Sequence, residues 1–511
     1  MFPGPESGAW VPRWLAACCL AALAACGGGG GGPAGDPDPA PLPPSSAFAS
    51  RCVNPRVLSP TQPYLDSPGT LADEKAFVRS WVHETYLWYR ELPVLDPAPY
   101  ASAQALFADL RTPALTASGQ PKDRFHYTVP TAEWEALSDA GIEAGYGIVW
   151  AVPQATPPRR VLVAQVAPGS PAAAAGIARG AEVLAVDGVD MVNGTDVTAL
   201  NKGLYPSAAG QPHAFRLLDR GASVAREVAL TSARLSKPPV PEVRTFDAPA
   251  GKVGYLLFND HIATAEAALA DAIRQFRSAG IVDLVLDVRY NGGGLLDVAA
   301  ELAYMIAGPQ ATAGKDFERL RFNDKNPFGF SAEQQRTPFH ATARGFSLPL
   351  GQELPSLGLG RVFVLSSRDT CSASESIING LRGAGVAVHQ VGSTTCGKPY
   401  GFYPRENCGT MYFSIQFEGV NHLGEGGYVD GLAPGCSVAD DFDHLLGDPA
   451  EAQLAAALGW QRDGVCTAAA SARQALAAPS AASRPDAAPG PALLRPFWRS
   501  ERVLRPVPAQ P

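Results

Sequence analysis

Hydrophobic and polar positions change their spacing along this chain of 511 residues. Between about residues 73 and 137, apolar side chains recur at intervals of three and four, which predicts a small helical domain with Trp81 and Trp88 in its core. From about 141 to 235, short runs such as YGIVWAV and RRVLVAQVA predict strands around one short helix, SPAAAAGI. We therefore expect several domains of different class.

From about Val253 the pattern becomes an alternation of apolar strands with amphipathic helices, as in IVDLVLDV followed by LLDVAAELAYMIAG. This alternation predicts an α/β layer with a largely parallel sheet. Functional residues of such folds gather at the carboxyl ends of the strands. Two unusual loops lie there, LVLDVRYNGGGLLD and RVFVLSSRDTCSASE.

The second loop places Ser372 at the start of the predicted helix ASESIINGLRG. Converging N–H groups and the helix dipole at such a position stabilise negative charge on a substrate oxygen. A serine hydroxyl needs a base, and no histidine is suitably placed, since His389 falls within an apolar strand. The glycines of the first loop would let a backbone amide approach a ligand and complete an oxyanion hole. A phosphate cradle is the alternative, but no nucleotide-binding signature is present.

Lys398 supplies the missing base, because it is the only lysine after Lys325 in a chain that mostly uses arginine. An amine is a base only when neutral, and burial lowers the pKa of lysine because the charged form loses hydration. Arginine stays protonated and cannot replace it. The sequence thus predicts a Ser372/Lys398 dyad.

Composition narrows the class of partner. The formal net charge is -8 and no Lys/Arg-rich run occurs, which excludes a nucleic-acid partner. Six cysteines lie beyond residue 50, and an even number in an exported chain predicts disulfides, with fifteen possible pairings. Neither a C-x-x-C motif nor a histidine cluster accompanies them, so no zinc site is predicted. A serine nucleophile with a lysine base needs no metal or organic cofactor, and none is expected.

Both ends of the chain differ from its middle. The run WLAACCLAALAAC suits the apolar part of a secretory signal and ends in LAAC, which resembles the bacterial lipobox with Cys26 as the lipidated residue. We expect a lipoprotein signal peptide over 1–26, a flexible tether over 27–50, and a lipid anchor at the periplasmic face of a bacterial cell envelope. An ordinary cleavable signal is the alternative.

The Ala/Pro-rich tail 467–511 is predicted to be mostly disordered, although its segment LLRPFWRSERVLRP is amphipathic enough to touch a membrane or another domain.

The segment VLVAQVAPGSPAAAAGIARGAEVLAVDGVDM resembles the PDZ family, which predicts a PDZ domain over 141–235. This resemblance implies a carboxylate-binding loop at Gly145, Tyr146, Gly147 and Ile148, where a peptide C-terminus would add as a strand to the sheet edge. A domain that only gates its neighbour is the alternative reading.

Three motifs together, DVRYNGGGLLD, CSASE and a GK about two dozen residues later, resemble the tail-specific (C-terminal processing) serine peptidases, over roughly Asp73 to Gln461. The resemblance implies a multidomain α/β protein, with a helical N-terminal domain over 51–140, the PDZ domain, and a peptidase core over 236–466 related to the crotonase and Clp-type peptidases. It implies the following roles: nucleophile Ser372, general base Lys398, and oxyanion amides of Ala373 and Gly293.

The chain departs from this family at Pro399 and Phe402, where the family often has glycine and a glutamine that orients the base. Glu375, one turn from the nucleophile, is the candidate positioning residue. If the dyad forms, Cys371 and Cys396 are close enough to bridge; Cys408 with Cys436 and Cys52 with Cys466 complete the expected set.

The resulting hypothesis is a lipid-anchored serine endopeptidase of the cell envelope, whose PDZ domain selects or gates polypeptide substrates by their C-termini. A non-catalytic peptide-binding scaffold with the same fold is the alternative. The sequence predicts no oligomeric state.

Overall fold

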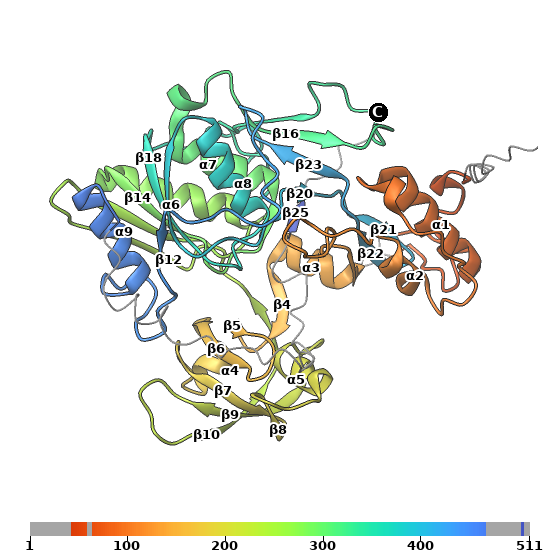
Figure 1. The fold of residues 1–511 in the computed structure, drawn as a ribbon, viewed down its shortest axis with the longest axis horizontal. Helices are drawn as coiled ribbons and strands as arrows, with labels where there is room; N and C mark the ends of the chain where they lie inside the picture. Colours follow the sequence, from red (N-terminus) through yellow and green to blue (C-terminus); the bar gives the residue numbers. More distant parts are fainter. Residues whose placement is uncertain (1–41, 59–63, 467–501, 505–511) are drawn as a thin grey trace, which may run out of the picture. The chain divides into compact units, whose positions relative to one another are not determined.

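The computed structural model describes residues 42–58, 64–466 and 502–504 (Figure 1). The predicted signal peptide, Cys26 and most of the predicted tether lie outside the described residues. The end of that tether is not free chain: it contains the 3-10 helix η1 (Ser45–Ala47), and Ser45 donates from its backbone N–H and its hydroxyl to the Glu84 carboxylate. The predicted tether is therefore too long at its C-terminal end.

The predicted N-terminal helices are present but do not form a core alone. Helix α1 (Leu71–Thr85) begins at a capping box between Thr70 and Asp73, and η2 (Tyr89–Glu91) and α2 (Ala103–Asp109) follow. The elements around them are β1 (Arg51–Cys52), β2 (Ser67–Pro68), β3 (Tyr127–Pro130) and α3 (Thr131–Ala140). Strand β3 pairs with β22 (Thr410–Phe413), which pairs with β21 (Arg405–Asn407). The helices thus share one buried cluster with residues near position 410.

The predicted PDZ strands form a six-stranded sheet in the order β10-β9-β7-β6-β5, with β8 attached to β7. Its elements are β5 (Ile148–Gln154), β6 (Arg160–Val166), α4 (Pro171–Ala174), β7 (Glu182–Val186), β8 (Val189–Asp190), α5 (Val197–Leu204), β9 (Pro212–Leu218) and β10 (Arg226–Thr231). Strands β4 (Ile142–Gly145) and β11 (Ala233–Ser236) pair with each other where the chain enters and leaves this sheet. The sheet and its helices enclose their own apolar cluster, and β5 and β10 are the two edge strands.

The predicted α/β layer is confirmed as a second six-stranded sheet, in the order β12-β13-β14-β18-β19-β24 and parallel except for β12. Its strands are β12 (Glu242–Phe246), β13 (Val253–Leu257), β14 (Asp283–Asp287), β18 (Arg361–Ser366), β19 (Ala387–Gly392) and β24 (Cys436–Ser437). Its helices are α6 (Ala265–Ala279), α7 (Leu296–Thr312), α8 (Ala373–Gly383) and α9 (Ala452–Asp463).

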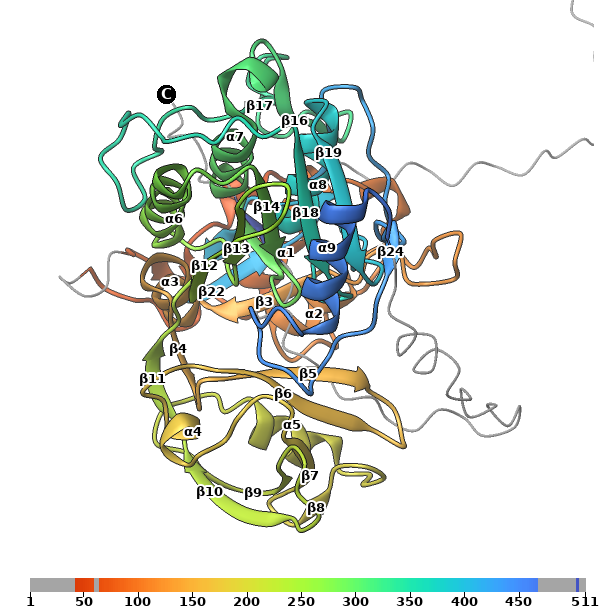
Figure 2. The ribbon, with the colours of Figure 1, turned by 90° about the vertical axis from the view of Figure 1, so that its left-hand side faces the viewer.

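Alternate residues of these strands face two different apolar clusters. Helices α6, α7 and α8 belong to the cluster on one face. Helix α9 belongs to the cluster on the other face, and Figure 2 shows it beside β18. The sheet is therefore covered on both sides, as a parallel sheet requires.

A four-stranded sheet, in the order β17-β16-β23-β20, was not predicted. It consists of β16 (Asp316–Phe322), β17 (Arg336–Pro338), β20 (Tyr400–Gly401) and β23 (Phe417–Val420).

In the described part of the chain, no helix has the length and apolar character needed to cross a membrane.

Among the described residues, three disulfides join elements that are separated in the sequence. The predicted Cys371–Cys396 bridge is confirmed. The other two predicted pairings are wrong: Cys52 bonds to Cys408, and Cys436 bonds to Cys466. The reason is that the N-terminal layer packs against the β21–β22 hairpin, whereas α9 returns along the sheet toward β24.

Candidate active site

Ser372 lies at the turn between β18 and α8, where the chain reverses into the helix. Its backbone has φ 60° and ψ -117°, a conformation that side-chain-bearing residues rarely adopt. The Asn291 carbonyl holds this turn, because it accepts hydrogen bonds from Cys371 N (3.1 Å) and Ser374 Oγ (3.0 Å). Ser372 is fully buried, and its Oγ makes no hydrogen bond with any described residue. A strained serine with an unused hydroxyl at a helix N-terminus is typical of a nucleophile.

Lys398 is fully buried on a neighbouring loop. Its Nζ lies 4.3 Å from the ring centroid of Phe402 and 5.0 Å from that of Phe125. The Arg124 guanidinium donates a hydrogen bond to the Cys396 carbonyl and so holds the loop that carries Lys398. Phe402, which stands where the tail-specific peptidases often have glutamine, thus forms part of the surroundings of the amine.

Glu375 connects these two loops through backbone groups. Its Oε2 accepts from Ser372 N (2.9 Å) and Lys398 N (2.8 Å), and its Oε1 accepts from Gly397 N (2.9 Å) and from the Thr395 hydroxyl. Burial raises the pKa of Glu375, and these hydrogen bonds oppose that rise. The carboxylate therefore fixes the backbone beside both predicted dyad members.

The Cys371–Cys396 disulfide makes the same connection covalently, with its Cα atoms 5.2 Å apart. Cys371 precedes Ser372, and Cys396 lies two residues before Lys398. The structure thus places the serine loop and the lysine loop side by side.

The predicted oxyanion glycine requires a correction. The Gly293 N–H already donates to Asn291 Oδ1 (2.9 Å), so this amide is not available to bind a substrate oxyanion. In β15 (Gly293–Leu295), the Gly293 carbonyl accepts from His261 N (3.3 Å), and Leu295 N donates to the His261 carbonyl (2.7 Å). Since successive residues of a strand direct their backbone groups to opposite sides, the Gly294 amide faces away from His261.

Sequence reasoning missed His261. Its Nδ1 donates to Asn291 Oδ1 (3.0 Å), and burial lowers its pKa to about 4, so the ring is neutral at neutral pH. Its place at the carboxyl end of a strand of the parallel sheet was the available signal. Through Asn291, it supports both the glycine strand and the serine turn.

Three family models match consecutive parts of the chain. They are the peptidase S41 N-terminal domain (residues 73–127), the PDZ domain (137–202) and peptidase family S41 (252–402). The chain contains a peptidase family S41 domain.

Relatives of this S41 chain include two cyanobacterial carboxyl-terminal-processing proteases. The protein from Synechocystis sp. is 31% identical over 137 residues, which is 26% of this chain and 31% of the relative. The protein from Picosynechococcus sp. is 32% identical over 142 residues, 27% of this chain and 32% of the relative. The chain thus spans about a third of the length of these relatives. A solved S41 protein from Bacteroides fragilis shares the fold, with a TM-score of 0.57 at 22% identity, over 76% of this chain and 97% of that one.

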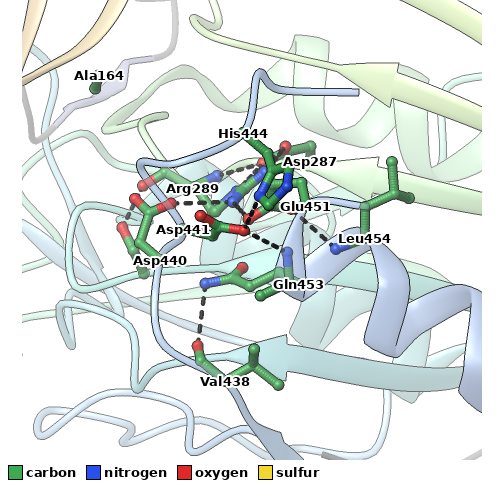
Figure 3. Close-up of polar contacts among 12 residues, drawn as sticks. Ala164, Asp287, Arg289, Val438, Asp440, Asp441, His444, Glu451, Gln453 and Leu454 are labelled. Carbon is green, nitrogen blue, oxygen red and sulfur yellow. Dashed lines mark hydrogen bonds and ion pairs between the residues drawn. The ribbon is translucent and has the colours of Figure 1, made fainter. Parts of the chain in front are cut away.

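In the S41 core, a buried ion network lies directly before the glycine strand. Figure 3 shows Arg289 among Asp287, Asp440 and Glu451, at 2.7, 3.1 and 2.7 Å respectively. Arg179, from the turn between α4 and β7 of the PDZ region, also pairs with Asp440 (2.7 Å). The network therefore joins the PDZ region to the loop that carries the glycines.

The PDZ loop of this S41 chain is only partly open. Gly145 belongs to β4, and the buried Tyr146 donates its hydroxyl to the Gly203 carbonyl on α5 (2.9 Å). Gly147 and Ile148 line a surface pocket together with the end of β6. A Cβ on Gly147 would come within 2.3 Å of Ser170. The structure thus brings only the second half of the predicted loop to a pocket.

Two groups of metal-ligand side chains occur among the described residues: Cys52, Glu74 and Cys408, and Cys371, Glu375 and Cys396. In each group the two cysteines form a disulfide and offer no thiolate. These groups do not fit a metal ion.

Proposed function

We propose that this S41 chain is a serine endopeptidase in which Ser372 is the nucleophile and Lys398 the general base. The observation that carries the proposal is the double connection between their loops, covalent through Cys371–Cys396 and polar through Glu375. Two loops held together this firmly around an unused serine hydroxyl and a buried amine suit nucleophilic catalysis.

In the proposed reaction, the neutral Lys398 amine takes the Ser372 hydroxyl proton as Oγ bonds to the substrate carbonyl carbon. The resulting ammonium gives that proton to the leaving amine, and the peptide C–N bond breaks. Water, deprotonated by the same amine, then hydrolyses the acyl-enzyme ester. The full burial of Lys398 supports the base role in this proposal, because burial in general disfavours the charged form of an amine.

Two amides are proposed to bind the oxyanion. The Ala373 N–H starts α8, where the positive end of the helix dipole adds to the hydrogen bond. Gly294 replaces Gly293 as the second donor, because the Gly293 amide is bound to Asn291. Glu375 is a positioning residue, since its carboxylate accepts hydrogen bonds from backbone N–H groups and from the Thr395 hydroxyl.

For the remaining regions, the predicted partners and domain bounds are part of the proposal, except for the C-terminal end of the tether, which is corrected above. The PDZ sheet would bind substrate C-termini at the edge strand β5, near Gly147 and Ile148. Export and attachment to the cell envelope would follow from lipidation of Cys26.

The test is cleavage of an unfolded protein such as casein by the purified chain and by Ser372→Ala. The matched control is Ser376→Ala, the same change one turn further along α8, with folding of each variant confirmed by circular dichroism. We expect a loss of at least about 10³-fold in Ser372→Ala and in Lys398→Arg, and near-normal activity in Ser376→Ala. Full activity in Lys398→Arg would contradict the base assignment.

A non-catalytic peptide-binding scaffold is the second candidate. It is favoured by one observation, that Phe402 contacts the Lys398 amine at the position where the tail-specific peptidases often have the glutamine that orients the base. Absence of cleavage by every variant, together with absence of labelling of Ser372 by a fluorophosphonate, would favour the scaffold.

A further inference from the structure

A short segment near the end of the chain lies against the glycine strand of the site. Strand β25 (Arg502–Leu504) pairs in parallel with β15, with Gly293 opposite Arg502, Gly294 opposite Val503 and Leu295 opposite Leu504. Figure 1 shows β25 beside β20, the strand that begins two residues after Lys398. The segment therefore lies between the glycine loop and the lysine loop.

The backbone of β15 explains why a strand adds here. One edge is occupied by His261, through the bonds of Gly293 O and Leu295 N. The alternation of a parallel ladder directs the Gly294 N–H and carbonyl to the other edge, where β25 lies. Buried backbone groups without partners destabilise a folded protein, so this edge favours any extended chain that satisfies them.

Gly294 also explains why this edge is built from glycine. Its φ is 143°, and a Cβ there would come within 2.5 Å of the His261 carbonyl oxygen. Only glycine lets β15 keep His261 on one side and present its backbone on the other.

We propose that the segment around Arg502–Leu504 is a tethered occupant of the strand position that a substrate backbone takes, and that it inhibits the resting protein. This inference rests on the proposed peptidase function, since Gly294 is also the proposed oxyanion donor. Main-chain pairing is independent of sequence, so the same edge accepts a substrate and the chain's own tail.

The tether makes a weak contact effective. A ligand on the same chain can act at an effective concentration in the millimolar range. If the dissociation constant of the segment is about a tenth of its effective concentration, the segment occupies about nine tenths of the sites. Only about a tenth of the sites are then open to substrate, and kcat/KM falls about tenfold. A polypeptide substrate must displace the segment before the substrate can be cleaved.

The test replaces two successive residues of β25 with proline, Val503→Pro together with Leu504→Pro, in the full-length chain. Proline has no N–H for a ladder, and the double change removes the donor whichever residue supplies it. The matched control is Ala487→Pro together with Ala488→Pro, the same chemical change elsewhere in the tail. Intact mass confirms that each sample retains its tail.

We expect about a tenfold rise in kcat/KM for casein in the β25 variant, and none in the control. Hydrogen exchange of the Gly294 amide, which faces β25, should accelerate in the same variant alone. Unchanged exchange would overturn the pairing, and accelerated exchange without a gain in activity would overturn the inhibition.

A binding measurement separates this inference from the proposed chemistry. In the Ser372→Ala background, which the proposed mechanism makes inactive, a fluorescent peptide of residues 498–511 should bind the β25 variant more tightly than it binds the control. If no variant cleaves casein, the proposed function fails, yet exchange and peptide binding still decide whether β25 occupies this edge. Equal peptide binding to both variants would overturn the inference.

Discussion

Removing the Cys371–Cys396 disulfide tests whether the site depends on holding two loops together. The bridge closes a segment with a sequence separation of 25. In the chain-entropy relation, a loop of that size contributes about 3.5 kcal/mol to the free energy of unfolding. The variant Cys371→Ala with Cys396→Ala should lose about this amount.

The chain contains its own control. Cys436–Cys466 has a separation of 30, for which the same relation gives about 3.6 kcal/mol. It joins the edge strand β24 to the segment after α9, away from the serine turn. Two double-alanine variants with nearly equal stability losses therefore differ in whether the missing bridge adjoins Ser372.

The assay combines urea unfolding, followed by tryptophan fluorescence, with kcat/KM for casein under conditions where both variants are folded. Both unfolding midpoints should fall by similar amounts, while kcat/KM falls about 10–100-fold only without Cys371–Cys396, because small displacements of reacting groups are costly. Equal activity losses in the two variants would show a general effect of stability. Full activity without Cys371–Cys396 would refute the reasoning that the bridge positions the site.

Three further predictions concern buried ionisable side chains. Glu375→Gln places an NH₂ group against backbone donors, so kcat/KM should fall about 100-fold with little change in KM, as measured by steady-state kinetics. Arg289→Met leaves Asp287 and Glu451 as buried, unpaired carboxylates and should cost about 3–5 kcal/mol in urea unfolding. Burial raises the pKa of Glu301 from 4.5 to about 9, so the folded chain holds a proton there that the unfolded chain loses above pH 4.5. This contribution to stability is complete below pH 4.5 and is lost as pH rises to 9, so Glu301→Gln should add about 3 kcal/mol at pH 7 and nothing at pH 4.

The parts of the site that lie on regular elements were predictable. The apolar run of β18 and the helical spacing of α8 leave little choice for the turn between them, so Ser372 could be placed from periodicity alone. Lys398 was found by its rarity, because a lysine among arginines points to chemistry that arginine cannot perform.

Long-range pairing explains most of what could not be predicted. Cys52 meets Cys408 because β3 pairs with β22, nearly 300 positions later, and no local pattern encodes that register. Gly293 and Gly294 are equivalent in the sequence, and only the bonds to Asn291 and His261 distinguish them. Phe402 stood out as a departure from the family, but its contact with the Lys398 amine needs coordinates.

The strain at Ser372 argues that the site is held by its surroundings. A positive φ at a serine costs on the order of 1–3 kcal/mol, so neighbouring contacts must oppose its relaxation. Asn291 holds the residues on either side of Ser372, and Glu375 holds its N–H. Each of these groups also binds a second loop, Asn291 the glycine strand and Glu375 the lysine loop. Relaxation of the Ser372 backbone would therefore disturb the proposed oxyanion donor and the proposed base together. The serine, the oxyanion donor and the base are thus coupled through the backbone rather than through contacts between the reacting groups.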